Sequence, residues 1–234
     1  MIKHARKRGD TLIEVMLAVG IFSMVAVAVV AVMSSGTSSA QTALETTLAR
    51  EEIDAQAEAL RFIQSSYIAE KGDEDGTFAK LWDKITKNAI AIGEKSEDDQ
   101  KQIVQFYPDD CSILYDNQNA FIINTRAISS GDSAIISIKD KPELFTAAST
   151  YPRLIYYNDD DSSLASKNED TNLISAEGIY IIAVKDPGTI IVDEEKSAYY
   201  DFYIRTCWYG TGDKIPSTIS TVMRLYDPNS LKKQ

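Results

Sequence analysis

The hydrophobic pattern of the chain changes stepwise along its length. Residues 15–33 carry no charge, and only Gly20 and Ser23 depart from apolarity. At about 1.5 Å per residue, a helix of this length spans roughly 28 Å, close to the thickness of the hydrocarbon core of a bilayer. The run therefore predicts a membrane-inserted helix.

Residues 37–70 have a helical pattern of a different kind. Apolar residues recur at roughly helical spacing between charged ones, which is typical of an amphipathic helix outside the membrane. These apolar residues are Leu44, Leu48, Ile53, Ala57, Leu60 and Tyr67. Because no proline interrupts residues 10–70, we expect one long helix that ends at the glycines and charges of residues 71–76. Two helices broken near residues 34–39 are the alternative.

The pattern of residues 71–234 predicts a mixed head. Thr77 can cap a second helix, and its apolar face would hold Phe78, Leu81, Trp82 and Ile85. From Ile103 onward short β-type runs are bounded by turn residues, and residues 129–132 and 210–213 are candidate hairpin turns. The runs are residues 113–115, 121–125, 134–138, 153–157, 178–184, 198–209 and 220–226. We expect an α+β fold, in which a long N-terminal helix packs with its second half against a mostly antiparallel β-sheet.

The residues before the apolar run are basic. Lys3, Arg6, Lys7 and Arg8 precede it, so the positive-inside rule places this end in the cytoplasm and the C-terminal bulk outside. A secretory signal peptide also has a basic start, but its apolar core is shorter and a small-residue cleavage site follows it. Residues 34–40 offer such a site, which leaves this alternative open.

A short motif joins the basic leader to the apolar run: Gly9, then Asp10, then Thr11-Leu12-Ile13-Glu14. Together with the leader and the helix, this motif resembles the N-terminus of type IV pilins and the related pseudopilins. The resemblance covers roughly the first 60 residues. It implies cleavage after Gly9 by a prepilin peptidase, N-methylation of Asp10, and assembly through the helix that starts with Thr11, Leu12, Ile13 and Glu14.

The resemblance also implies partners and a location. The implied partners are the prepilin peptidase, other pilin subunits, the pilus assembly platform and membrane lipid. The protein would first be a single-pass protein of the inner or sole membrane with its head outside, and then part of a filament on the cell surface. On this basis the chain divides into a leader (residues 1–9), a membrane or filament-core helix (10–36), its amphipathic continuation (37–70) and an extracellular head (71–234).

Glu14 is the one carboxylate at the entrance of the apolar run. A charge in the membrane costs a few kcal/mol, so an intramembrane carboxylate is a functional candidate whose partner must be named. The family implies that this partner is the amino terminus of a neighbouring subunit. A Glu that reaches the membrane interface, or that favours the helix N-terminus, is the simpler alternative.

The chain departs from the family at two points. Asp10 stands where an apolar residue, commonly Phe, follows the cleavage site, and the helix has no proline. With the sizeable head, these departures favour a minor pilin over a major one, and a pseudopilin of a secretion or competence system remains open. From another class, the alternative is a single-pass membrane-anchored extracellular binding protein.

The residue inventory argues against an enzyme. The single histidine, His4, lies in the leader, so the mature protein would have no Ser-His-Asp or Cys-His catalysis and no histidine zinc site. The sequence also has no Gly-rich phosphate loop, no H-E-x-x-H and no C-x-x-C. A glycosidase with paired carboxylates remains open, but abundant acidic residues are no sign of pairing. We expect no catalytic residue and no cofactor.

Two further runs invite a binding site. Residues 158–161 and 169–170 offer oxygen ligands for calcium, but they lack the spacing and turn glycine of an EF-hand loop, so a solvated acidic loop is favoured and no metal is expected. An aromatic run suggests a groove, although a single strand with one face on the core explains it more simply. This run consists of Tyr199, Tyr200, Phe202, Tyr203, Trp208 and Tyr209.

Cys111 and Cys207 are the only cysteines, and both fall in the predicted external part. An even count outside the cell favours a disulfide, with two free thiols as the alternative. The net charge is −11, and removal of the four basic leader residues leaves −15. An acidic head repels phosphate, so no nucleic-acid partner is expected.

Overall fold

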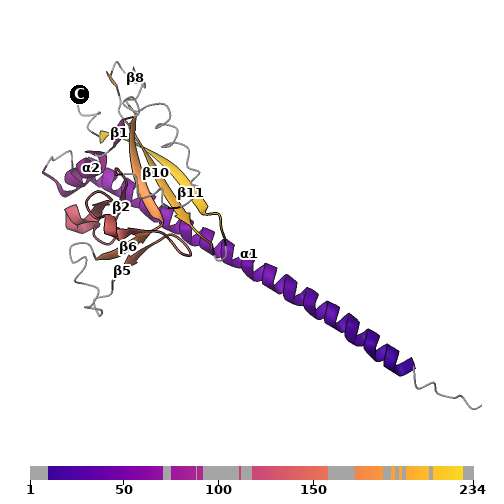
Figure 1. Cartoon of the computed structure of the whole chain (residues 1–234). Coiled ribbons are helices and arrows are strands. Elements are labelled where there is room, and N and C mark those ends of the chain that lie inside the picture. The colour runs from indigo at the N-terminus through magenta and orange to yellow at the C-terminus, as the bar shows by residue number, and fades with distance from the viewer. Residues whose placement is uncertain are drawn as a thin grey trace, which may run out of the picture. The chain divides into compact units, whose positions relative to one another are not determined.

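The computed structural model describes residues 10–70, 75–87, 89–91, 111, 118–157, 172–186, 191–192, 195–196, 199–210 and 213–228 (Figure 1). The chain divides into two compact units, Met1–Leu44 and Glu45–Gln234. Its elements are α1 (Asp10–Ala69), α2 (Thr77–Lys87), β1 (Ile90–Ala91), β2 (Phe121–Ile123), the 3-10 helix η3 (Ile128–Ala134), β3 (Ile135–Ser137), the 3-10 helix η4 (Pro142–Leu144), β4 (Phe145–Thr146), β5 (Arg153–Tyr156), β6 (Leu173–Glu177), β7 (Ile179–Asp186), β8 (Ile191–Val192), β9 (Glu195–Lys196), β10 (Tyr199–Trp208) and β11 (Ser217–Tyr226).

Helix α1 runs through both units. It is helical without a break from Asp10 to Ala69, so the predicted single helix is confirmed and the alternative of a break at residues 34–39 is wrong. In the first unit the described side chains of residues 12–44 are all exposed. In the second unit the helix buries four of the predicted apolar residues, Ile53, Ala57, Leu60 and Tyr67, and Leu48 is half-buried. Leu44, which the pattern placed on the packed face, is 59% exposed.

The head is built on one six-stranded sheet. Its strand order is β11-β10-β7-β2-β3, and these neighbours pair antiparallel. The short β1 pairs with β7 in parallel. In the long central strands, Tyr203 of β10 lies opposite Ile182 on one side and Val222 on the other. The predicted α+β fold, with a long N-terminal helix packed on a mostly antiparallel sheet, is confirmed.

Two smaller sheets complete the head. Strands β4, β6 and β5 form a three-stranded sheet in that order, with β4 parallel and β5 antiparallel to β6. Strands β8 and β9 pair with each other as an antiparallel ribbon. The predicted β runs did not include β1, β4, β6, β8 or β9, because these strands are short or lie in segments without alternation.

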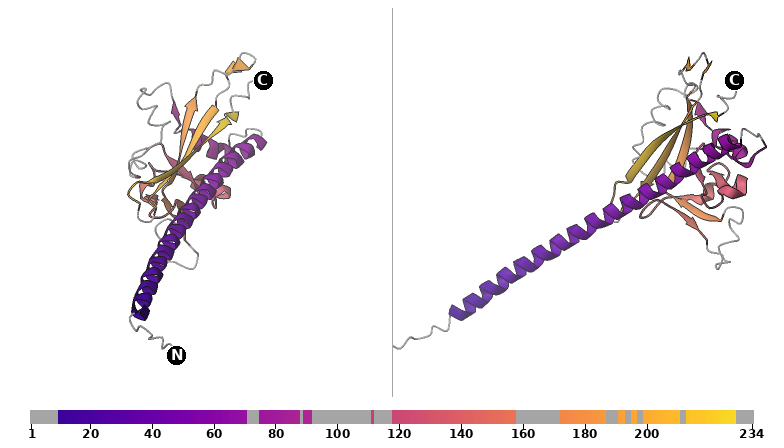
Figure 2. Two further views of the ribbon diagram at one scale, coloured as in Figure 1. Left: turned by 90° about the vertical axis from the view of Figure 1, so that its right-hand side faces the viewer. Right: turned by 180° about the vertical axis from the view of Figure 1, so that it is seen from behind.

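The six-stranded sheet has a hydrophobic core on each face. One core packs α1 and α2 against the sheet, and Figure 2 shows the second half of α1 running along it. Helix α2 contributes Leu81, Trp82 and Ile85 to this core, as the sequence predicted. The other core lies between the sheet and the β4-β6-β5 sheet and includes Ile182, Leu173 and Phe145.

Because both faces of the sheet are covered, β10 is buried at all ten positions. Tyr200 and Phe202 belong to the core beneath α1 and α2, whereas Tyr203 belongs to the opposite core. The expectation that only one face of this aromatic strand packs on the core is therefore wrong. The alternation was read correctly, but the second layer could not be foreseen from it.

The two predicted turns have different outcomes. Residues 210–213 lie between β10 and β11, which form a hairpin, and the Asp213 N–H donates to the Gly210 carbonyl at 3.0 Å. Residues 129–132 link the antiparallel strands β2 and β3, but they do so within the 3-10 helix η3 instead of a tight turn. Gly131 has φ of 75° there, which favours glycine. The predicted run at 113–115 and most of the predicted helix end at 71–76 lie outside the described residues.

Candidate functional site

The first half of α1 presents an uncovered apolar surface. Its large apolar residues from Leu12 to Met33 are 46–78% exposed. By length and composition α1 qualifies as a membrane-spanning helix. A contiguous apolar surface of this extent is unusual on a monomeric soluble protein and marks contact with lipid or with other proteins. The helix is compatible with a single-pass membrane anchor.

Glu14 lies in the first turns of this helix and is exposed. In the sequence it is the only charged residue between Thr11 and Leu44. Leu12 and Ile13, next to it, are 65% and 69% exposed. Asp10 and Thr11 are also helical, and the predicted cleavage residue Gly9 lies outside the described residues. The motif residues from Asp10 to Glu14 thus share the start of one helix, and their predicted roles stay predictions.

Some of the hydroxyl groups along the exposed helix have backbone partners. Ser23 donates to the Val19 carbonyl at 2.8 Å, and Thr37 donates to the Met33 carbonyl at 3.0 Å. A hydroxyl bonded to the carbonyl four residues earlier needs no water, which suits a helix in lipid or in a dry protein interface. Gly20 and Gly36 have no side-chain neighbours within 4 Å of where a Cβ would stand, so no contact in the structure requires them to be glycine.

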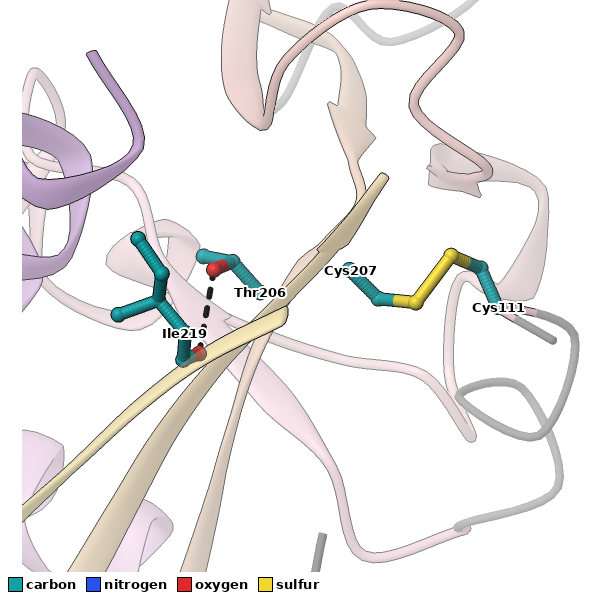
Figure 3. The surroundings of a disulfide bond; sticks show 4 residues. All are labelled: Cys111, Thr206, Cys207 and Ile219. Atoms are coloured by element: carbon teal, nitrogen blue, oxygen red, sulfur yellow. Dashed lines mark hydrogen bonds between the residues drawn. A yellow bond between two sulfur atoms is a disulfide. The ribbon is translucent and has the colours of Figure 1, made fainter. Parts of the chain in front are cut away.

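A disulfide joins Cys111 to Cys207 near the end of β10 (Figure 3). The Cα atoms are 5.6 Å apart, and the two residues are 1% and 0% exposed. The neighbouring Thr206 donates its hydroxyl to the Ile219 carbonyl at 3.1 Å, which ties β10 to β11 at the same level. The disulfide favoured by the cysteine count is present, and it fixes residue 111 to a central strand 96 positions later.

A buried glutamine binds α1 to the sheet. The Gln56 side chain is fully buried, its Nε2 donates to the Ile123 carbonyl, and its Oε1 accepts the Ile123 N–H, both at 3.0 Å. Glutamine thereby satisfies both backbone groups of a strand residue, as a neighbouring strand would. One turn earlier, burial raises the pKa of Glu52, although hydrogen bonds with Gln56 and with the Leu154 backbone oppose this shift.

A pair of charged groups joins the edge strand β11 to its neighbour β10. Arg224 of β11 donates from Nε and Nη2 to the two carboxylate oxygens of Asp201 on β10, each at 2.7 Å. Its guanidinium lies 4.0 Å from the ring centre of Tyr199. This bidentate pair fixes the hairpin register and leaves the Asp201 carboxylate occupied.

Sequence reasoning missed Gln56, Glu52 and the Asp201–Arg224 pair. For Gln56 a signal existed: it is a polar residue at a core-facing position, three residues after Ile53 and four before Leu60. Such a residue must find a buried partner, but the pattern does not say which. The cross-strand pair depends on a register that the sequence does not reveal.

The predicted absence of a metal site is not tested. Within the described residues no group of three or more His, Cys, Asp or Glu side chains gathers. The acidic residues 158–161 and 169–170, weighed as calcium ligands, lie outside the described part of the chain. Most of the aromatic run is buried, since Tyr199, Tyr200, Phe202, Tyr203 and Trp208 are at most 9% exposed. Tyr200 and Phe202 belong to one core and Tyr203 to the other, whereas Trp208 packs in a separate small cluster.

No family model, no curated protein and no solved structure matches the chain. The features that bear on function are the exposed first half of α1, Glu14 within it and the disulfide-bonded head.

Proposed function

We propose that this chain is a subunit of a type IV pilus or related pilin-like filament, cut after Gly9 and polymerised through the first half of α1. One observation carries the proposal: the Thr11-Leu12-Ile13-Glu14 motif stands at the start of a helix whose apolar side chains are exposed along residues 12–33. Such an apolar surface is unfavourable in water. Lipid would shield it from water before assembly, and the helices of neighbouring subunits would shield it afterwards.

Two further features support this proposal. The buried disulfide suits a head that folds in an oxidising compartment, and the basic leader favours a cytoplasmic N-terminus, which together imply a head outside the cell membrane. Glu14 alone carries charge in an otherwise apolar segment, so a neighbouring amino terminus would give it a partner in the dry filament core. The head would then form the outer surface, available for adhesion or partner contact.

The proposal is tested first by intact-mass and N-terminal peptide mass spectrometry of the protein from its native membrane and from sheared surface material. We expect a mature terminus at Asp10, with or without an added methyl group. A terminus at Met1 would contradict processing, and one near Ala40 would indicate a secreted soluble protein. Either of these results would withdraw the filament proposal.

Assembly is tested by Glu14→Ala, with Glu51→Ala as the matched control. Both changes remove an exposed carboxylate from α1, but Glu51 lies in the second unit, outside the apolar segment. We expect Glu14→Ala to lower the amount of the chain in sheared filaments by at least about a hundredfold, because removing one partner of a buried ion pair costs about 3 kcal/mol or more. The control should assemble normally. Equal incorporation of both variants would show that Glu14 has no role in assembly.

A second candidate is a single-pass membrane-anchored binding protein with its head outside. The acidic Asp10, where the pilin pattern has an apolar residue, favours it. This candidate needs no cleavage after Gly9 and gives Glu14 no partner, so the same mass measurement separates the two.

A further inference from the structure

The exposed part of α1 stops at a sharply defined residue. The described side chains from Leu12 to Leu44 are all exposed, and Glu45 is the first buried one at 6%. Ala49 and Ile53 follow at 0% and 3%, one and two turns further on. The first residue held by the head is therefore a carboxylate, where an apolar side chain would be the simpler choice.

The Glu45 carboxylate has a directional partner in the sheet. The indole N–H of Trp208, the last residue of β10, donates to Glu45 Oε2 at 3.3 Å. Trp208 is 2% exposed and packs in a small cluster with Ala49 and Ala148. Trp208 thus holds the helix in two ways, by a hydrogen bond at Glu45 and by packing one turn later. Apolar packing alone would let the helix rotate or slide, whereas this bond fixes both its rotation and its register.

The hairpin turn after β10 leaves room for this carboxylate. A Cβ on Gly210 would stand 3.3 Å from Glu45 Oε2 and 2.5 Å from Asp213 Oδ2. A side chain at this position would therefore make the carboxylates of Asp213 and Glu45 move from where they stand. The φ of Gly210 is not in the left-handed region, so its effect here is through space and not through backbone conformation.

The other side of Trp208 is also fixed. Cys207, the preceding residue, carries the disulfide to Cys111. A Cβ at Gly178 would stand 2.4 Å from the Cys207 carbonyl oxygen, so the backbone between β6 and β7 approaches the end of β10 very closely. The residue that holds the helix thus directly follows a disulfide-bonded residue.

We propose that Glu45, Trp208 and Gly210 form a mechanical joint that fixes the position on α1 at which the head begins to contact the helix. A force on the exposed part of α1 is therefore transmitted to β10 at this point. This inference goes beyond the proposed function and does not depend on it. A membrane anchor and a polymerised helix both transmit force to the head through the same turn of α1. When the joint opens, the docked part of α1 shortens from the Glu45 end, and Ala49 and Ile53 are released next.

Residue-resolved hydroxyl-radical footprinting of the full chain in detergent micelles tests the joint. Two pairs of residues serve as probe and reference. Trp208 and Trp82 are both 2% exposed, and Ile53 and Ile63 are 3% and 0% exposed. Trp208 belongs to the joint and Ile53 to the part of α1 that is released next, whereas Trp82 and Ile63 serve as references. The variants are Glu45→Ala, which alters the helix side, and Gly210→Ala, which alters the turn.

We expect Glu45→Ala to raise labelling of Trp208 and Ile53 about tenfold, because it removes the hydrogen bond between the Trp208 indole and the buried carboxylate. Gly210→Ala should raise labelling of the same two residues, because the added Cβ displaces that carboxylate from the indole. Labelling of Trp82 and Ile63 should stay unchanged. The control Glu58→Ala removes a carboxylate whose side chain is 70% exposed and which pairs with Arg61, and it should change none of the four.

Two results would overturn the joint. Unchanged labelling of Ile53 in both variants would mean that the helix stays docked without these groups. An equal rise at all four probes would mean that the residues support the head fold as a whole and not the grip on α1. If Gly210→Ala does not fold, Glu45→Ala decides alone, since it leaves every sheet residue in place.

Discussion

The two halves of α1 have the same backbone structure and opposite surfaces. Residues 12–33 expose their large apolar side chains, whereas between Ile53 and Tyr67 the apolar side chains at helical spacing are buried on the sheet. Charged residues are absent from 15–44 and frequent from 45 to 61. The difference shows that both halves form a helix whatever surrounds their side chains. The charge pattern decides whether water or an apolar medium surrounds each half.

The largest expected effect comes from removing the disulfide, which constrains the head and not the first half of α1. The double variant Cys111→Ser, Cys207→Ser should lower the free energy of unfolding of the head by about 4 kcal/mol, because the disulfide closes a long loop. Denaturant unfolding in detergent, followed by the fluorescence of Trp82 and Trp208, measures this loss. An unchanged midpoint would show that the bond adds nothing to the stability of the head.

The next prediction compares one substitution in both halves of α1. Leu60→Ala should cost about 3 kcal/mol of head stability, because Leu60 is fully buried and leaves a cavity. Leu17→Ala changes a residue that is 63% exposed, and its effect on head unfolding should stay within about 0.5 kcal/mol. The same unfolding measurement checks both. Equal losses would contradict the contrast between the two halves.

A smaller effect is expected at the glutamine that binds the helix to β2. Gln56→Ala should cost about 2 kcal/mol, because it leaves the N–H and carbonyl of Ile123 buried without these partners. Gln64→Ala is the control, since it removes a hydrogen bond to the Tyr226 carbonyl at an exposed site. We expect the control to cost less than about 0.5 kcal/mol. A similar cost for both would show that burial does not matter here.

The smallest effect appears only at alkaline pH. Burial, with a contribution from the nearby Asp227 carboxylate, raises the pKa of Tyr200 to about 12. The folded state therefore favours the neutral phenol, and this contribution is complete below pH 10 and is lost as the pH rises from 10 to 12. At pH 11 the loss is about 1 kcal/mol. Tyr200→Phe should flatten this decline in a series of unfolding measurements, and an unchanged slope would contradict the assignment to Tyr200.

The sequence predicts the elements with long, regular patterns. Helix α1 was expected at residues 10–70 and lies at Asp10–Ala69, and the β runs at 198–209 and 220–226 correspond to β10 and β11. Short strands paired over long distances escaped, such as the parallel pairs β1–β7 and β4–β6. Two residues per strand carry too little periodicity to be recognised, and the tertiary contacts decide them.

The candidate site residues show the same difference between local patterns, which the sequence reveals, and long-range contacts, which it does not. The motif around Glu14 and the pairing of two cysteines follow from local spacing and from a count. Glu45 and Trp208 lie 163 residues apart, and nothing in either neighbourhood points to the other. A buried carboxylate in a helical pattern looks the same as an exposed one until the strand register is known. Such residues are found only once the fold is known.

The complete burial of β10 also bears on how related sequences can differ. A strand packed on both faces tolerates few changes of volume, so substitutions at its ten positions would mostly be lost to selection. Its neighbour β11 exposes Val222 at 53% and Tyr226 at 45%, and such positions are free to diverge. Sequence differences between homologues should therefore gather on β11, one strand away from positions that tolerate few changes.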